Sequence, residues 1–288
     1  MNLHDTRSRM SWPRLVVGAI VVAIISLSVH VIMLQVLGVP FPDRSGVPFW
    51  AAFLNVVLAV IALVTFYDLA TPQITAWPAW LRWLAIAVLF GSLKEVFRGN
   101  LMNGVVTTAW VFSFAQMIAP IVYSLVLSAF VVWALPIVRN TALKFGAMLV
   151  VAALMTFAVK PLVGLALSPL MAAVSSLNHE DVYPFPYGFH VLFWAYVTYL
   201  EPVIACFVAA ALVLPGLSLR QMVRTTQFTL LILCIKGALL PTLVFGFFNK
   251  SGVWTGMMSE SQFLLEGVAL AALVALIWPI ASHHTRER

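Results

Sequence analysis

Long apolar segments separated by short polar ones repeat along the whole chain. Each apolar segment is long enough to cross a hydrocarbon core of about 30 Å, which takes roughly 20 helical residues. The pattern predicts eight membrane-spanning helices, with approximate bounds 13–38, 49–70, 80–102, 109–136, 143–171, 188–215, 223–248 and 257–281. Because little sequence remains between them, we expect one transmembrane domain over residues 1–288, an all-α polytopic membrane bundle.

Composition and charge agree with this class. Hydrophobic residues make up 62% of the chain and charged residues only 9%, whereas soluble domains contain about a quarter charged residues. The formal net charge of +6 does not indicate nucleic acid as a partner, because Lys and Arg lie mostly in the short segments between apolar runs. In a membrane protein that placement is a topology signal, and the lipid bilayer is the expected partner.

The distribution of basic residues predicts the orientation. One set of connecting segments, together with both termini, carries Arg7, Arg9, Arg14, Arg82, Arg139, Lys144, Arg220, Arg224, Arg286 and Arg288. The opposite set holds only Arg44 and Lys250, with Arg98 on the border. Since cytoplasmic loops are enriched in Lys and Arg, both termini are expected in the cytoplasm, in a bacterial-type inner membrane. The apolar run from Leu15 to Leu37 is too long for a signal peptide and is interpreted as a retained first helix.

Pairs of predicted helices look like copies of one hairpin unit. Each unit has a polar residue inside its odd-numbered helix and closes with a proline at the cytoplasmic side. The polar residues and their prolines are His30 and Pro72, Lys94 and Pro136, Lys160 and Pro215, and Lys236 and Pro279. Their separations are 42, 42, 55 and 43 residues, so three agree within one residue and the third unit carries an insertion. We expect four tandem hairpin repeats; similar helix lengths alone are the alternative explanation.

Charged residues occur inside the predicted spans, where lipid does not tolerate unpaired charge. The segment from Leu93 to Gly99 holds Lys94, Glu95 and Arg98 within an apolar run. Other predicted helices carry comparable polar residues at His30, Lys160, Glu201, Lys236 and Glu266. At about 1.5 Å rise per residue, all of them lie at or beyond the midplane. We therefore expect them to meet in a shared pocket in the outer half of the bundle.

Helix breakers accompany these charges. Proline or glycine directly follows Lys160, Glu201, Lys236 and Glu266. Broken helices beside buried charges at mid-depth are a common way for transporters to build substrate and ion sites. The predicted substrate-binding cations are Lys94, Arg98, Lys160 and Lys236. The residues predicted to pair charges or relay protons are Glu95, Glu201, Glu266 and His30. The alternative is a set of static salt bridges that only fix the bundle.

Metal and cofactor chemistry finds little support in the sequence. The expected outer loop from Asn178 to His190 contains His179, Glu180 and Asp181, but their spacing matches no zinc motif. The chain also lacks a phosphate-binding loop, a dinucleotide fingerprint and the serine- and zinc-hydrolase motifs. No metal and no cofactor is therefore predicted.

Three functions remain open. The first is a transporter or channel-like carrier for a small anionic or zwitterionic solute, bound by the intramembrane cations. The second is a membrane enzyme acting on a lipid-linked phosphate, with Glu95 or Glu201 as general base. The third is a non-catalytic sensor or a subunit of a larger membrane complex, whose partner is another membrane subunit or a second copy of the chain.

Overall fold

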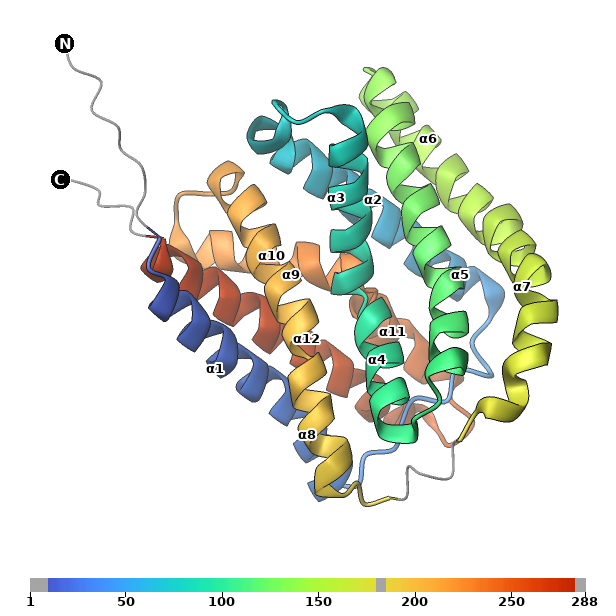
Figure 1. The fold of residues 1–288 in the computed structure, drawn as a ribbon. Helices are drawn as coiled ribbons and strands as arrows, with labels where there is room; N and C mark the ends of the chain where they lie inside the picture. Colours follow the sequence, from blue (N-terminus) through green and yellow to red (C-terminus); the bar gives the residue numbers. More distant parts are fainter. Residues whose placement is uncertain (1–9, 180–184, 283–288) are drawn as a thin grey trace, which may run out of the picture.

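The computed structural model describes residues 10–179 and 185–282, and these form a bundle of helices (Figure 1). Among them, six helices are long and apolar enough to cross a membrane. They are Trp12–Val36, Phe49–Ile74, Trp110–Ile137, Thr141–Leu177, Phe189–Gly216 and Val253–Ala281. This confirms the expected class, a multi-pass helical membrane protein. The terminal residues Arg7, Arg9, Arg286 and Arg288, which contributed to the predicted orientation, lie outside the described residues.

Two of the eight predicted spans are interrupted. The expected helix 80–102 is divided into α3 (Ala79–Leu93) and α4 (Val96–Thr107). The expected helix 223–248 is divided into α10 (Gln221–Lys236) and α11 (Leu239–Val244), and the chain bends by 82° at this break. The described part of the chain therefore has six uninterrupted spans, and the bent pair of α10 and α11 accounts for a seventh.

The other helices follow the predicted order with small differences at their ends. Their bounds are α1 (Trp12–Val31), α2 (Phe49–Ile74), α5 (Trp110–Ala129), α6 (Thr141–Leu154), α7 (Lys160–Val174), α8 (Phe189–Thr198), α9 (Leu200–Val213) and α12 (Val253–Ala281). A π-helical turn, Ile32–Val36, extends α1, and another, Met155–Val159, joins α6 to α7. π-Helical turns inside helices are frequent at functional sites.

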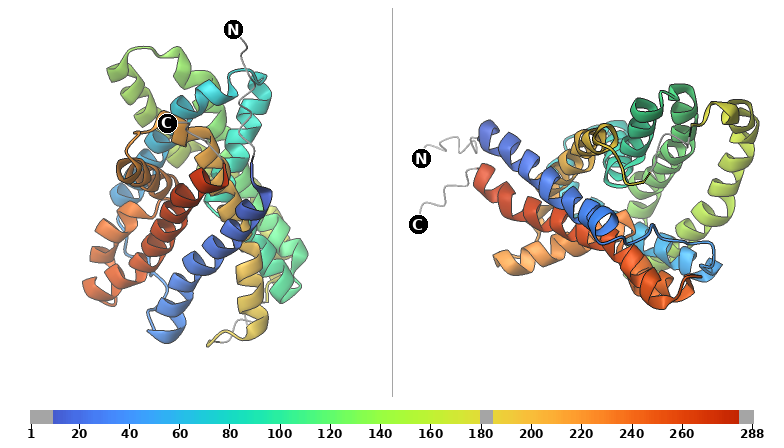
Figure 2. Two further views of the ribbon diagram at one scale, coloured as in Figure 1. Left: turned by 90° about the vertical axis from the view of Figure 1, so that its left-hand side faces the viewer. Right: turned by 90° about the horizontal axis from the view of Figure 1, so that it is seen from below.

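Helices α1 and α12 run side by side, and α6 and α7 lie on the opposite flank (Figures 1 and 2). The amide of Ser11 donates to the carbonyl of Ala281 at 2.9 Å, so the two described ends of the chain meet at one end of the bundle. Helix α9 occupies the centre, in contact with α1, α2, α3 and α12. Its buried side chains include the small residues Ala205, Cys206 and Ala209, which let neighbouring helices approach closely.

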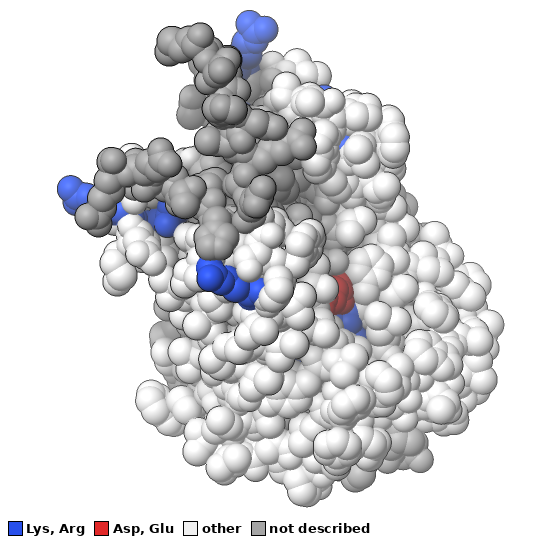
Figure 3. Space-filling view, turned by 60° about the vertical axis from the view of Figure 1, so that its left-hand side comes forward, with Lys and Arg blue, Asp and Glu red and all other residues white. Residues whose placement is uncertain are grey.

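The outer surface of the bundle is apolar over most of its area. On α7, Leu162 and Leu165 are 63% and 73% exposed, as expected for side chains that face lipid tails. Figure 3 shows basic side chains near the end where the described termini lie. The rest of this face is almost uncharged, except that acidic and basic atoms lie together in a hollow near its centre. The charged interior of the bundle therefore reaches the surface at restricted points.

Candidate functional site

Two interrupted helices meet inside the bundle. Helix α3 ends at Leu93, with Lys94 as its C-cap residue, and Glu95 follows with a left-handed backbone (φ 60°). Helix α10 ends with Lys236, and Gly237 follows with φ 71°. The amides of Glu95 and Gly237 donate to the carbonyls three residues back, at 3.0 and 3.2 Å. Lys94 Nζ then donates to the Lys236 carbonyl at 3.2 Å, which joins one break to the other.

Glu95 is the central anion of this cluster. Its Oε1 atom pairs with the ammonium of Lys236, and its Oε2 atom pairs with the guanidinium of Arg98. The side chains of Lys236 and Glu95 are only 8% and 20% exposed, so both ion pairs are largely shielded from water. The Arg98 guanidinium also lies over the ring of Tyr199, 4.8 Å from its centre. Three predicted site residues from two helices are therefore in direct contact.

At both breaks, a charged side chain of favourable sign contacts an interrupted helix end. Glu201 of α9 accepts a hydrogen bond from the backbone amide of Arg98, in the first turn of α4. The ammonium of Lys94 binds the last carbonyl of α10. Because a helix is partly positive at its N-terminus and partly negative at its C-terminus, both contacts stabilise the exposed ends. Glu201 and Lys94 thus replace the backbone partners that the breaks remove.

His30 and Glu266 form a second, looser pair beside the cluster. His30 Nδ1 lies 3.9 Å from Glu266 Oε2, and no hydrogen bond joins them. The imidazole packs between the rings of Phe41 and Phe263, whose centres are 5.6 and 4.9 Å away. Glu266 is 2% exposed, and its carboxylate interacts with the hydroxyl group of Tyr199. The carboxylate also lines a cavity, from which a ligand or a proton can reach it.

Two cavities flank the junction of the breaks. The first, which we name the strap cavity, has a volume of about 390 Å³; its lining includes Arg44, Lys94, Glu95, Lys236, Phe263 and Glu266. The second, the lateral cavity, has a volume of about 560 Å³; its lining includes Phe90, Lys94, Glu95, Tyr123, Lys160 and Val163. Lys94 and Glu95 line both. Lys94 is exposed although it lies between helices, because its side chain faces these spaces.

Lys160 stands apart from the other predicted cations. It lies at the start of α7, lines the lateral cavity and makes no ion pair or hydrogen bond with any residue in the described ranges. Lys94, Arg98 and Lys236 gather around Glu95, but Lys160 approaches them only across the cavity. The predicted convergence of four cations is therefore seen for three of them.

Two functional candidates, Arg44 and Glu260, were missed in the sequence. Arg44 Nε and Nη2 donate to the two oxygens of Glu260, both at 2.7 Å, and Glu260 is 3% exposed. Sequence reasoning treated Arg44 only as a topology signal. The two residues are 216 positions apart, so no local spacing connects them. The available signal in the sequence was Glu260 itself, an acidic residue near the start of the last predicted helix, 257–281.

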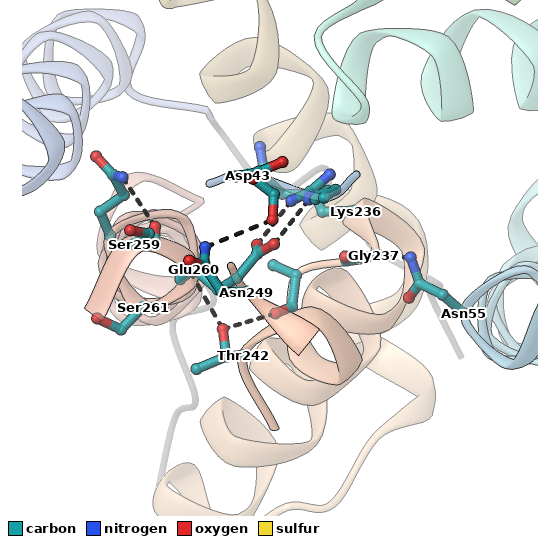
Figure 4. Close-up of polar contacts among 12 residues, drawn as sticks. Asp43, Asn55, Lys236, Gly237, Thr242, Asn249, Ser259, Glu260 and Ser261 are labelled. Carbon is teal, nitrogen blue, oxygen red and sulfur yellow. Dashed lines mark hydrogen bonds and ion pairs between the residues drawn. The ribbon is translucent and has the colours of Figure 1, made fainter. Parts of the chain in front are cut away.

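This ion pair fastens residues 37–48, which we name the strap, over the strap cavity. Gln262 Nε2 donates to the carbonyl of Pro40 at 3.1 Å, and Asn249 Nδ2 donates to the carbonyl of Asp43 at 3.4 Å. Figure 4 shows Asn249 and Glu260 pointing toward the segment around Asp43. Within the strap, hydrogen bonds from Ser45 lower the pKa of Asp43 below its usual value.

The expected outer loop 178–190 is described only in part. Glu180 and Asp181 lie outside the described residues, whereas His179 and His190 lie within them. Over residues 10–179 and 185–282, no group of three His, Cys, Asp or Glu side chains is placed to hold a metal ion.

The fold and the site together define a class: a multi-pass helical membrane protein with a charged cluster where two interrupted helices meet. No known protein family, no curated protein and no solved structure matches the chain.

Proposed function

We propose that this protein is a membrane carrier for a small anionic or zwitterionic solute. The observation that supports this function best is the position of Lys94. Its side chain lies at the contact between two helix breaks and lines a cavity on each side. Its ammonium is held by one backbone carbonyl and by the face of Phe90, 5.8 Å from the ring centre, rather than by a carboxylate. A cation in this position is available to an anion entering from either cavity.

The geometry favours a division of roles among the site residues. Arg98 and Lys236 are both paired with Glu95, so we assign them to positioning this carboxylate rather than to binding the solute directly. In the strap cavity, Lys94 would bind the anionic group of the solute, and Glu266 would bind an ammonium group or hold a proton. Transport then requires the strap to open, because Arg44 and Glu260 fasten it over this cavity.

The proposal includes eight membrane crossings with both termini in the cytoplasm of a bacterial-type inner membrane. Counting α3 with α4, and α10 with α11, as one crossing each gives this number. The contact between Ser11 and Ala281 supports an even number of crossings. The four-hairpin repeat is supported by the matching breaks, since Lys94 and Lys236 each precede a residue with positive φ. Basic side chains near the terminal end support the cytoplasmic placement (Figure 3).

Solute-dependent stabilisation tests this function. The purified protein is melted with inorganic phosphate, sulfate, acetate or glutamate, each titrated to millimolar concentrations. An anion at 100 times its dissociation constant adds about 2.7 kcal/mol of stability, which corresponds to a rise in Tm of roughly 5–10 °C. We expect at least one anion to stabilise the protein, Lys94→Met to abolish the shift, and Lys94→Arg to retain part of it.

The matched control is Lys144→Met, which removes a lysine paired with Asp68 far from the cavities. This variant should respond to the anion as the unchanged protein does. If no anion shifts the Tm of the unchanged protein, or if Lys94→Met responds fully, the carrier function is wrong. A stoichiometric partner in the purified sample, combined with no anion response, favours the sensor or subunit function instead.

A further inference from the structure

The lateral cavity differs from the strap cavity in the charge that faces it. Its polar lining includes the ammonium groups of Lys94 and Lys160, and neither of them is paired with a carboxylate. The acidic side chain in its lining is Glu95, whose two oxygens are already bound by Lys236 and Arg98. The cavity therefore presents an excess of positive charge, and an occupant must bring negative charge to offset it.

Lys160 lies where an unpaired cation is most costly. It is close to the middle of the 37-residue helical segment Thr141–Leu177, about 28 Å along the axis from its start. A lysine at the centre of a membrane-spanning helix costs on the order of 3 kcal/mol on insertion scales. Since no described residue pairs with it, a bound anion would remove most of this cost.

Lys160 is exposed, and the face of α7 that carries it borders the lateral cavity. Val163, one turn later on the same face, lines the lateral cavity as Lys160 does. Leu162 and Leu165 lie on other faces and are 63% and 73% exposed. Helix α7 packs mainly on α5 and otherwise lies at the periphery of the bundle (Figure 1). The cavity that α7 lines is therefore next to the lipid-facing surface.

The remaining lining shows what else the occupant needs. Tyr123 supplies a hydroxyl group, and most other lining residues are apolar: Val56, Phe90, Val96, Ala119, Pro120 and Val163. The volume of about 560 Å³ falls within the usual range of ligand sites, about 300–1,000 Å³. A small hydrated anion would fill only the charged end and leave the apolar end empty.

We infer that the lateral cavity binds an amphiphilic anion, with its phosphate or carboxylate group between Lys94 and Lys160 and its hydrocarbon chain against the apolar wall. This inference rests on the proposed function in one respect, because it names the class of anion that the carrier takes from the membrane side. The binding site itself does not depend on transport.

The test uses the full-length protein in nanodiscs of phosphatidylcholine, which carries no net charge. Three probes separate head group from tail: dodecyl phosphate, inorganic phosphate and dodecanol. Binding is measured from the concentration dependence of thermal unfolding. We expect dodecyl phosphate to bind at least tenfold more tightly than inorganic phosphate, and dodecanol to give no specific stabilisation.

Variants on one helical segment then locate the site. Lys160→Met should weaken dodecyl phosphate binding at least tenfold, whereas Lys160→Arg should keep it within about threefold, because the charge is retained. Lys144→Met, in α6 of the same segment, should bind as the unchanged protein does. Equal binding of inorganic phosphate, binding of dodecanol as tight as that of dodecyl phosphate, or full binding by Lys160→Met would overturn the inference.

The outcomes also separate this inference from the proposed function. If no soluble anion stabilises the protein but dodecyl phosphate binds through Lys160, the carrier of small soluble solutes is wrong and the lateral site stands. If a soluble anion binds through Lys94 and dodecyl phosphate does not bind, the lateral site is wrong and the carrier stands.

Discussion

The two interrupted helices reach the same backbone geometry with different residues. In each, a lysine lies at the helix end and the next residue has positive φ, with its amide donating to the carbonyl three residues back. In the first break that residue is Glu95, and α4 starts again directly after it. In the second it is Gly237, and the chain turns by 82° before continuing. One break therefore places a charged side chain at the junction, and the other places bare backbone there.

This difference indicates what each break contributes. A residue other than glycine at positive φ costs about 1–3 kcal/mol and persists only where its surroundings hold it. Glu95 is held by Lys236 and Arg98, so its conformation and its ion pairs depend on each other. At Gly237 a Cβ atom would lie 2.9 Å from Asn55 Nδ2 and 3.4 Å from Lys94 Nζ. The missing side chain lets polar groups approach the exposed backbone.

Replacing Glu95 is expected to have the largest effect. Glu95→Gln keeps the shape of the side chain but leaves Lys236 and Arg98 without their shared anion. Removing one partner of a buried ion pair costs about 3–5 kcal/mol, because the remaining charge stays buried without compensation. The free energy of unfolding, or the Tm in a fixed detergent, measures this loss.

The control for Glu95→Gln is Asp68→Asn, which breaks the pair with Lys144. The Asp68 side chain is 53% exposed, so its pair should contribute less than about 1 kcal/mol. If the two variants lose similar amounts of stability, Glu95 is not the anion that holds the junction.

Gly237→Ala should have an intermediate effect. The new methyl group would meet the amide of Asn55, and the positive φ disfavours any L side chain, so we expect a loss of about 2 kcal/mol. Gly164→Ala in α7 is the matched control, since nothing lies within 4 Å of its added Cβ. That substitution should be neutral or stabilise the helix by up to about 1 kcal/mol. Equal stability of the two variants would show that the second break tolerates a side chain.

The sequence predicted which charged residues lie inside the bundle better than it predicted where the helices are interrupted. Lipid excludes unpaired charge, so the positions of Lys94, Arg98 and Lys236 were enough to place them inside. The break after Lys236 was indicated by the adjacent glycine. The break at Glu95 was not, because no proline or glycine lies beside it and the expected helix ran through 80–102 without interruption. At this break Glu95 contacts Lys236, which is 141 residues away in the sequence, so no local pattern could indicate the contact.

Other differences between the predicted and the observed structure have the same origin, namely contacts between segments far apart in the sequence. Pro161 indicated a disturbed helix beside Lys160, and the structure has a π-helical turn there, Met155–Val159, instead of a sharp break. The pairing of Arg44 with Glu260 depends on how the strap folds back over α12, which local patterns do not encode. Interactions within one or two helical turns were predictable, and those between distant segments were not.

The smallest expected effect belongs to Asn55, which supports the second break from α2. Its Nδ2 atom donates to the Gly237 carbonyl at 3.4 Å, a long hydrogen bond, and Figure 4 shows the side chain pointing to that group. Asn55→Leu should lower the free energy of unfolding by about 1 kcal/mol. The loss is small because Gly237 lines the strap cavity, where water can take the place of the Asn55 amide at the Gly237 carbonyl. The Tm of this variant should therefore stay above that of Gly237→Ala. A loss as large as that of Glu95→Gln would mean that the second break, like the first, depends on one side chain. The contrast between a break held by a charged side chain and a break that exposes backbone would then be wrong.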